Sequence, residues 1–117
     1  MFYLEALKSK ILNYSEYDQE QIVKAFHFAE EAHREQVRKS GEAYIMHPVA
    51  VACMLADMKL DRSSVMTGLL HDTVEDTPVT LEDIDKQFGK EISYLVAGVT
   101  KLKKIALQSD RMSQAEN

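Results

Sequence analysis

Apolar residues recur along most of the chain with the three- and four-residue spacing of an α-helix, and this pattern restricts the possible folds most strongly. In the segment 91–103, for example, one helical face would carry Ile92, Leu95, Val96, Val99 and Leu102. Only two prolines and four glycines interrupt the chain, and no useful stretch alternates apolar and polar residues as a half-buried strand does. We therefore predict an all-α fold.

The predicted fold is a helical bundle of about six helices in a single domain, residues 1–117, because 117 residues leave no room for a second core. The expected helices span 2–12, 18–36, 48–60, 62–75, 80–88 and 91–103. Asp18, Asp61 and Thr80 are the expected N-caps, and Leu12 is expected on the apolar stripe of the first helix. Residues 37–44 read as a loop, and the polar tail after residue 107 is expected to fray.

Charge and hydropathy exclude several classes of partner. The net charge of −5 argues against sequence-independent nucleic-acid binding, which requires a surplus of Lys and Arg. No apolar run approaches the roughly 20 residues that span a bilayer, and no basic-then-apolar signal opens the chain. We expect no membrane partner and a cytoplasmic location. Cys53 is the only cysteine, which rules out an intrachain disulfide and a thiolate cluster for zinc.

The segment 69–77 places one histidine and three carboxylates directly after two leucines. On a helix, His71 and Glu75 would stand one turn apart, as would Asp72 and Asp76, so like charges would face each other. A bound cation would relieve this repulsion, and so would full exposure to water. Two interpretations therefore stay open at this point, a metal site and a solvated acidic helix end.

A second histidine strengthens the metal hypothesis. His47 lies at the predicted start of the third helix, so it could join His71 and Asp72 if the third and fourth helices pack side by side. Mixed imidazole and carboxylate ligands favour manganese, iron or zinc over calcium. Three protein ligands leave positions open for water, whose pKa a metal lowers, and Glu75 and Asp76 could then orient that water or transfer its proton.

A basic stretch in the loop offers a possible phosphate site. Arg38 and Lys39, followed by Ser40 and a glycine, could hold phosphate oxygens, and the guanidinium could also stack on a base. The alternative is an ordinary solvated loop.

Four segments, taken together and in order, closely resemble the N-terminal hydrolase domain of the RelA/SpoT alarmone enzymes. They are residues 38–48, 69–77, 88–89 and 98–102. This family belongs to the HD superfamily of all-helical, metal-dependent phosphohydrolases. The resemblance implies hydrolysis of the guanosine tetra- and pentaphosphates (p)ppGpp to GDP or GTP and pyrophosphate by metal-activated water, usually with Mn²⁺.

The resemblance also assigns roles to individual residues. It implies metal ligands at His47, His71 and Asp72, a catalytic acidic pair at Glu75 and Asp76, and a nucleotide-contacting loop at Arg38, Lys39 and Ser40.

By the same resemblance, the chain is the amino-terminal piece of a longer hydrolase domain. The fourth metal ligand, an aspartate, and further nucleotide-binding residues are expected beyond Asn117. We therefore expect weak Mn²⁺ binding, little or no turnover by this chain alone, and an uncovered core face through which it could self-associate.

Two alternatives to (p)ppGpp hydrolysis remain. The first is an HD phosphohydrolase that acts on another nucleotide or phosphoester. The second is a module without catalytic activity that binds the alarmone or a partner chain.

Overall fold

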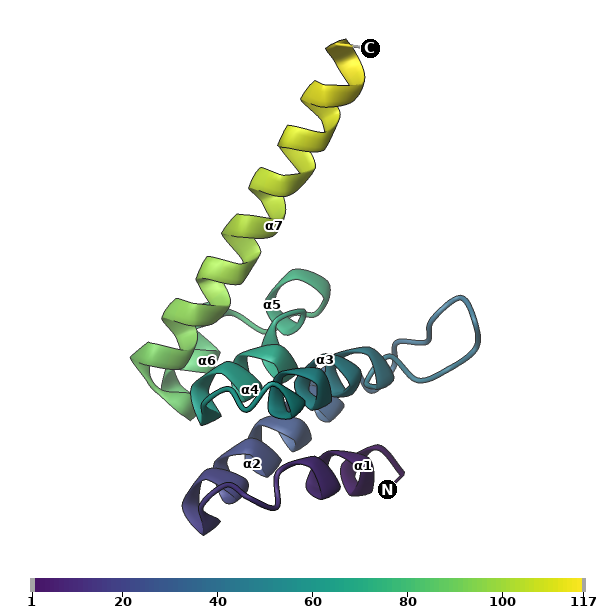
Figure 1. Ribbon diagram of the computed structural model, residues 1–117. Coiled ribbons are helices and arrows are strands. Elements are labelled where there is room, and N and C mark those ends of the chain that lie inside the picture. Colours follow the sequence, from purple (N-terminus) through teal and green to yellow (C-terminus); the bar gives the residue numbers. More distant parts are fainter. Residues whose placement is uncertain (1, 117) are drawn as a thin grey trace.

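The computed structural model describes the backbone of residues 2–116 and the side chains of residues 2–109. Figure 1 shows the helices, which are α1 (Phe2–Lys10), α2 (Glu16–Ala32), α3 (Met46–Asp57), α4 (Arg62–Leu70), α5 (Thr73–Asp76), α6 (Leu81–Phe88) and α7 (Lys90–Glu116). Residues 2–116 contain no β-strand, only an isolated antiparallel bridge between Val37 and Ala43. The predicted all-α fold is confirmed.

Helix α4 lies at the centre of the bundle, where it packs against α2, α3 and α7. Seven of its nine residues are buried: Ser63, Val65, Met66, Thr67, Gly68, Leu69 and Leu70. Around it, the core is completed mainly by Leu7, Ile11, Ile22, Ala25, Phe26, Ala29, Val49, Ala52, Ile84, Ile92 and Val96. Because α4 is enclosed on several sides, the residues that follow Leu70 begin inside the protein.

One helix was predicted over 62–75, and the structure divides it into α4 and the one-turn helix α5. Side chains compete for the last carbonyls of α4: His71 Nδ1 lies 2.6 Å from the Gly68 oxygen, and the Thr73 hydroxyl donates to the Leu70 oxygen at 2.8 Å. Such side chain to backbone bonds offer an alternative to continued helix. The prediction of a single helix is therefore wrong, and the acidic residues lie in and before a separate turn.

The start of α2 also differs from the prediction. Ser15, not Asp18, is the N-cap, because its extended backbone lets the hydroxyl accept a hydrogen bond from the Asp18 N–H at 3.1 Å. Helix α1 ends at Lys10, so Leu12 leaves the apolar stripe and is 69% exposed.

Of the other two predicted caps, Thr80 caps its helix with its side chain, whereas Asp61 is at the N-cap position without a side-chain capping bond and accepts instead from the Ser64 hydroxyl. Asp61 precedes α4, and Thr80 and Asp83 form a reciprocal capping box at the start of α6. Gly89 ends α6 with a φ of 96°, a left-handed conformation that glycine adopts without a steric cost.

Helix α7 is much longer than predicted. It runs to Glu116 and extends beyond the rest of the bundle (Figure 1), so the prediction of a frayed tail is wrong. The reason is local propensity, since the tail lacks glycine and proline and contains Gln, Arg, Met, Ala and Glu, which favour helix. No helix in the described part of the chain has the length and apolarity needed to cross a membrane.

An apolar groove of about 340 Å³ runs between α3, α4 and α7. Its lining includes Val51, Leu55, Leu60, Leu95 and Val99, with His71 also on the lining. Tyr94 and Leu102, which are exposed, line an adjoining apolar hollow that shares Leu95 and Val99 with this groove. This is the surface to which the prediction of self-association applies.

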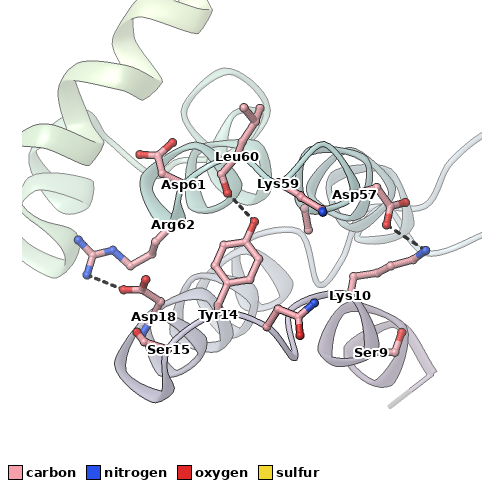
Figure 2. Close-up of a pocket in the computed structure, with 12 residues that line it drawn as sticks. Ser9, Lys10, Tyr14, Ser15, Asp18, Asp57, Lys59, Leu60, Asp61 and Arg62 are labelled. Carbon is pink, nitrogen blue, oxygen red and sulfur yellow. Dashed lines mark hydrogen bonds and ion pairs between the residues drawn. The ribbon is translucent and has the colours of Figure 1, made fainter.

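A second, polar groove of about 780 Å³ lies between the α1–α2 and α3–α4 connections (Figure 2), and no residue of the acidic segment 69–77 lines it. Lys10 pairs with Asp57 at 3.1 Å on one side, and Arg62 pairs with Asp18 at 3.4 Å on the other. These contacts join α1 and α2 to α3 and α4.

Candidate metal centre

Three side chains that could bind a metal converge where the start of α3 meets the end of α4. His47, His71 and Asp72 each offer one ligand atom, and these atoms all lie within 4.8 Å of one another. His47 is in the first turn of α3, while His71 and Asp72 form the connection between α4 and α5. The structure therefore brings together the three residues that the sequence marked as ligand candidates.

Close packing of two antiparallel helices makes this convergence possible. A Cβ atom placed on Gly68 of α4 would lie 3.6 Å from the Cα of Ala52 and 2.8 Å from Leu55 Cδ1, both on α3. The lack of a side chain at Gly68 thus allows α4 to lie against α3. Because only four residues connect the two helices, the start of α3 is adjacent to the end of α4.

The distances suit a shared ion. Oδ2 of Asp72 lies 3.1 Å from His71 Nε2 and 3.4 Å from His47 Nε2. Two ligands bound at right angles to one ion, with bonds of about 2.1 Å, would lie about 3 Å apart. The distances from Asp72 to each histidine are therefore close to those of two ligands on one ion, and the ligand atoms of the whole set lie within 4.8 Å of one another.

A backbone carbonyl sets the orientation of His71. Its Nδ1 lies 2.6 Å from the Gly68 oxygen, which can only accept, so Nδ1 carries the proton and donates it. In the neutral ring the lone pair is then on Nε2, which faces Asp72. Metal-binding histidines are commonly oriented by a hydrogen bond of this kind.

The two histidines have opposite pKa shifts. Burial lowers the pKa of His47 and outweighs the attraction of the Asp72 charge, which keeps this imidazole neutral. Burial also acts to lower the pKa of His71, but hydrogen bonds with Asp72 and the Gly68 carbonyl outweigh it and raise the pKa. Burial would raise the pKa of Asp72, yet hydrogen bonds with His71 and Lys103 hold it far below the usual range. Asp72 is therefore an ionised carboxylate inside the protein.

A lysine that the sequence analysis did not select neutralises the acidic residues. Lys103 of α7 places Nζ 2.8 Å from Asp72 Oδ1 and 2.9 Å from Glu75 Oε2. Lys103 is 31 positions further along the chain than Asp72, and neighbouring lysines stand at 101 and 104, so no local signal distinguishes it. The need for a positive charge beside the carboxylates was the only clue.

Tyr44, which precedes α3, contacts two of the carboxylates. Its hydroxyl lies 2.7 Å from Asp76 Oδ2 and 3.1 Å from Asp72 Oδ2. Burial, followed by these two carboxylates, raises the pKa of Tyr44 well above its usual value, so the phenol stays protonated as a donor. The ring stacks on His33, with centroids 4.4 Å apart. Tyr44 thereby links the candidate ligand Asp72 to the acidic residue Asp76.

The candidate phosphate loop is separate from these contacts. Arg38, Lys39 and Ser40 are exposed in a turn in which the Gly41 N–H donates to the Arg38 oxygen at 2.8 Å, and the loop projects from the bundle (Figure 1). Among the side-chain bonds of residues 2–109, none joins this loop to His47, His71 or Asp72. The loop affects the candidate metal ligands through the positive charge of Arg38, which helps to lower the pKa of His47.

The segment that contains these residues matches a known protein family. Residues 25–117 match the HD-domain family, a match that includes all three candidate ligands and both acidic residues. The chain belongs to the HD-domain family.

The relatives of this HD domain include alarmone enzymes. It is 48% identical over its whole length to the bifunctional (p)ppGpp synthase/hydrolase SpoT of Escherichia coli K12, of which it covers 17%. It is 46% identical, over 97% of its length, to the guanosine-3′,5′-bis(diphosphate) 3′-pyrophosphohydrolase of Aquifex aeolicus, of which it covers 16%. A GTP pyrophosphokinase of Myxococcus xanthus is 48% identical over 82% of the chain. This HD domain thus spans about a sixth of the length of the first two relatives.

The residues of this HD domain fit a divalent transition metal. Two imidazoles and one carboxylate form a donor set typical of first-row metals, and the Lys103 ammonium already stands beside the carboxylates as a cation. Three protein ligands would leave coordination positions for water or substrate.

Proposed function

We propose that this chain forms the metal-binding and acidic part of an enzyme site that hydrolyses (p)ppGpp to GDP or GTP and pyrophosphate. One observation carries the proposal: His47, His71 and Asp72 converge in an HD domain that is 46–48% identical to proteins named as (p)ppGpp hydrolases. The Arg38–Ser40 loop and the acidic pair Glu75 and Asp76 resemble those of the RelA/SpoT hydrolase domain, which supports the same substrate.

The proposed reaction adds water across the bond between the 3′ oxygen of the nucleotide and its pyrophosphate. When bound, Mn²⁺ would supply a Lewis acid and lower the pKa of a water molecule. His47, His71 and Asp72 would hold the metal. Water forms the new phosphorus–oxygen bond and loses a proton, the 3′ oxygen leaves with the electrons of the broken bond and gains a proton, and pyrophosphate is released.

Glu75 and Asp76 would accept the proton that water loses and donate the proton that the 3′ oxygen gains. Both carboxylates lie in α5, within one turn of Asp72. Each already accepts a hydrogen bond, Glu75 from Lys103 at 2.9 Å and Asp76 from Tyr44 at 2.7 Å, which holds both side chains in place. A carboxylate held in this way can orient water or accept its proton.

The substrate would be held by the exposed loop. Arg38 can bind phosphate oxygens in bidentate fashion, and Lys39 adds a second positive charge. Ser40 would contribute a hydroxyl donor. Arg38 and Lys39 would supply the local positive charge that an anionic substrate needs on a chain with a net charge of −5.

Titration calorimetry with Mn²⁺ tests the metal part of the proposal. We expect weak binding at one site, because three of four expected ligands are in this chain. Sub-micromolar affinity would contradict the proposed ligand count, while loss of binding in the Asp72→Asn variant would support the site.

A chimera tests the substrate. The chain replaces its 48% identical counterpart segment in the Escherichia coli relative, and release of pyrophosphate from ppGpp is measured with Mn²⁺. We expect hydrolysis by the chimera and its loss in the Asp72→Asn chimera.

The same assay, run with a panel of nucleotides, distinguishes the alternatives. Hydrolysis of another nucleotide or phosphoester in place of ppGpp would favour a different HD phosphohydrolase. Binding of ppGpp without product after prolonged incubation would favour a module without catalytic activity.

A further inference from the structure

Lys103 is the cation that pairs with two of the acidic residues at the candidate metal centre, Asp72 and Glu75. Its Nζ lies between Asp72 Oδ1 at 2.8 Å and Glu75 Oε2 at 2.9 Å, so one ammonium bridges two carboxylates. The Asp72 side chain is only 4% exposed and that of Glu75 is 23% exposed. The buried Asp72 carboxylate requires a positive partner, and Lys103 is one such partner, which also pairs with the more exposed Glu75.

The two oxygens of Asp72 have different neighbours. Oδ2 faces His71 at 3.1 Å and His47 at 3.4 Å, whereas Oδ1 faces Lys103. A divalent ion held by the histidines and Oδ2 would therefore share one carboxylate with the ammonium. The two positive charges would lie on opposite sides of a single anion, where each weakens the attraction of Asp72 for the other.

Lys103 belongs to a different part of the fold than the histidines and carboxylates of the candidate metal centre. His47, Asp72 and Glu75 belong to the α3–α5 region, whereas Lys103 lies in α7, which packs against α4. Its ion pairs are thus a direct link between α7 and α5. Binding of a metal at the site would therefore change the ion pairs that hold α7 near residue 103.

We propose that Lys103 is a built-in counter-ion that competes with the divalent metal for Asp72 and Glu75, so that α7 lowers the metal affinity of the site. The inference rests on the metal site of the proposed function. Lys103 neutralises the carboxylates in the absence of metal, and metal binding loosens its hold on them. The opposite possibility is that Lys103 only positions Asp72, in which case its removal would weaken metal binding.

The charge of Lys103 can be removed without a large change in volume. We expect Lys103→Met to bind Mn²⁺ about 10-fold more tightly than the unaltered chain, because a like charge close to the ion is lost in a partly screened environment. Lys104→Met is the matched control, since it changes the net charge equally one position further along α7. It should leave the affinity unchanged.

Hydrogen exchange of α7 supplies a readout that is independent of affinity. In the unaltered chain, Mn²⁺ should speed exchange in the part of α7 around residue 103, because the ammonium loses part of its attachment. In Lys103→Met this region should exchange faster without metal and should not respond to Mn²⁺.

The outcomes separate this inference from the proposed function. Tighter Mn²⁺ binding by Lys103→Met alone supports the competition. Unchanged or weaker binding overturns it, as does an equal gain in Lys104→Met. The His71→Ala variant reports on the site itself: Mn²⁺ binding that persists in His71→Ala would overturn the metal centre and not merely the role of Lys103.

Discussion

The Tyr44 hydroxyl donates a hydrogen bond of 2.7 Å to Oδ2 of Asp76, a residue 32 positions further along the chain. This bond connects the loop before α3 to the acidic turn α5. The same hydroxyl lies 3.1 Å from Oδ2 of Asp72, so one phenol is shared by a candidate ligand and a candidate catalytic carboxylate.

Replacing Tyr44 with Phe should weaken Mn²⁺ binding roughly 10-fold, because outer partners of metal ligands typically contribute about that much. The fold should persist, since the ring can still stack on His33. Calorimetry with Mn²⁺ and far-UV circular dichroism measure both effects. Tyr94→Phe is the control, because Tyr94 is 78% exposed on α7. An unchanged affinity in Tyr44→Phe would show that the hydroxyl does not support the site.

Removal of a proposed ligand should have a larger effect. His71→Ala deletes an imidazole whose Nε2 faces Asp72, so Mn²⁺ affinity should fall by more than the roughly 10- to 100-fold that an outer partner costs. His27→Ala provides the comparison, because His27 lies on α2 and pairs with Glu30. Equal losses in the two variants would indicate nonspecific binding of Mn²⁺.

The exposed loop should determine nucleotide affinity but not metal affinity. Arg38→Ala should weaken ppGpp binding by about 10-fold, the usual effect of losing a charge-assisted hydrogen bond. Lys86→Ala, on α6, is the control and should bind as the unaltered chain does. Fluorescence titration with a labelled ppGpp measures the affinity. If Arg38→Ala binds ppGpp as the unaltered chain does, residues 38–40 form an ordinary solvated loop and not a phosphate site.

The capping box of α6 should make stability depend on pH. The Asp83 carboxylate accepts a hydrogen bond from the Thr80 N–H at 3.0 Å, and the bonds with Thr80 lower the pKa of Asp83. A carboxyl with a lowered pKa stabilises the fold above its unfolded-state pKa, about 3.9, and loses this contribution as the pH falls through the folded value.

Asp83→Asn should therefore unfold at a lower temperature than the unaltered chain at neutral pH. The two melting temperatures should converge as the pH falls below the lowered pKa of Asp83. Asp85→Asn, on the same helix but outside the box, should show a smaller difference at neutral pH. A difference between Asp83→Asn and the unaltered chain that persists in acid would refute the electrostatic cause.

Self-association stays a prediction, and the groove between α3, α4 and α7 is where it can be tested. Leu102 is 66% exposed on α7 beside this apolar surface, so Leu102→Glu should not unfold the chain. If the chain dimerises there, sedimentation velocity should show a concentration-dependent dimer that Leu102→Glu abolishes. Leu12→Glu, a change at another exposed leucine, should leave the dimer intact. A chain that stays monomeric at high concentration would exclude this interface.

The fold class could be predicted because helical periodicity is a local property. The stripe in 91–103 and the capping box at Thr80 depend only on residues a few positions apart. Boundaries were less predictable, because they depend on competition for individual hydrogen bonds. The break after Leu70 arises from bonds to the Gly68 and Leu70 carbonyls, for which the segment 69–77 carries no distinctive pattern.

The sequence by itself determined the all-helical class, the acidic segment that follows a buried helix, and the three residues able to bind a metal. Only the tertiary structure decided that His47 meets Asp72 at 3.4 Å, that Tyr44 joins Asp72 to Asp76, and that Lys103 supplies the positive charge. The reason is physical: helix formation depends on neighbours within a turn or two, whereas these contacts join side chains 25 to 32 positions apart. Such contacts exist only once α3, α4 and α7 have packed together.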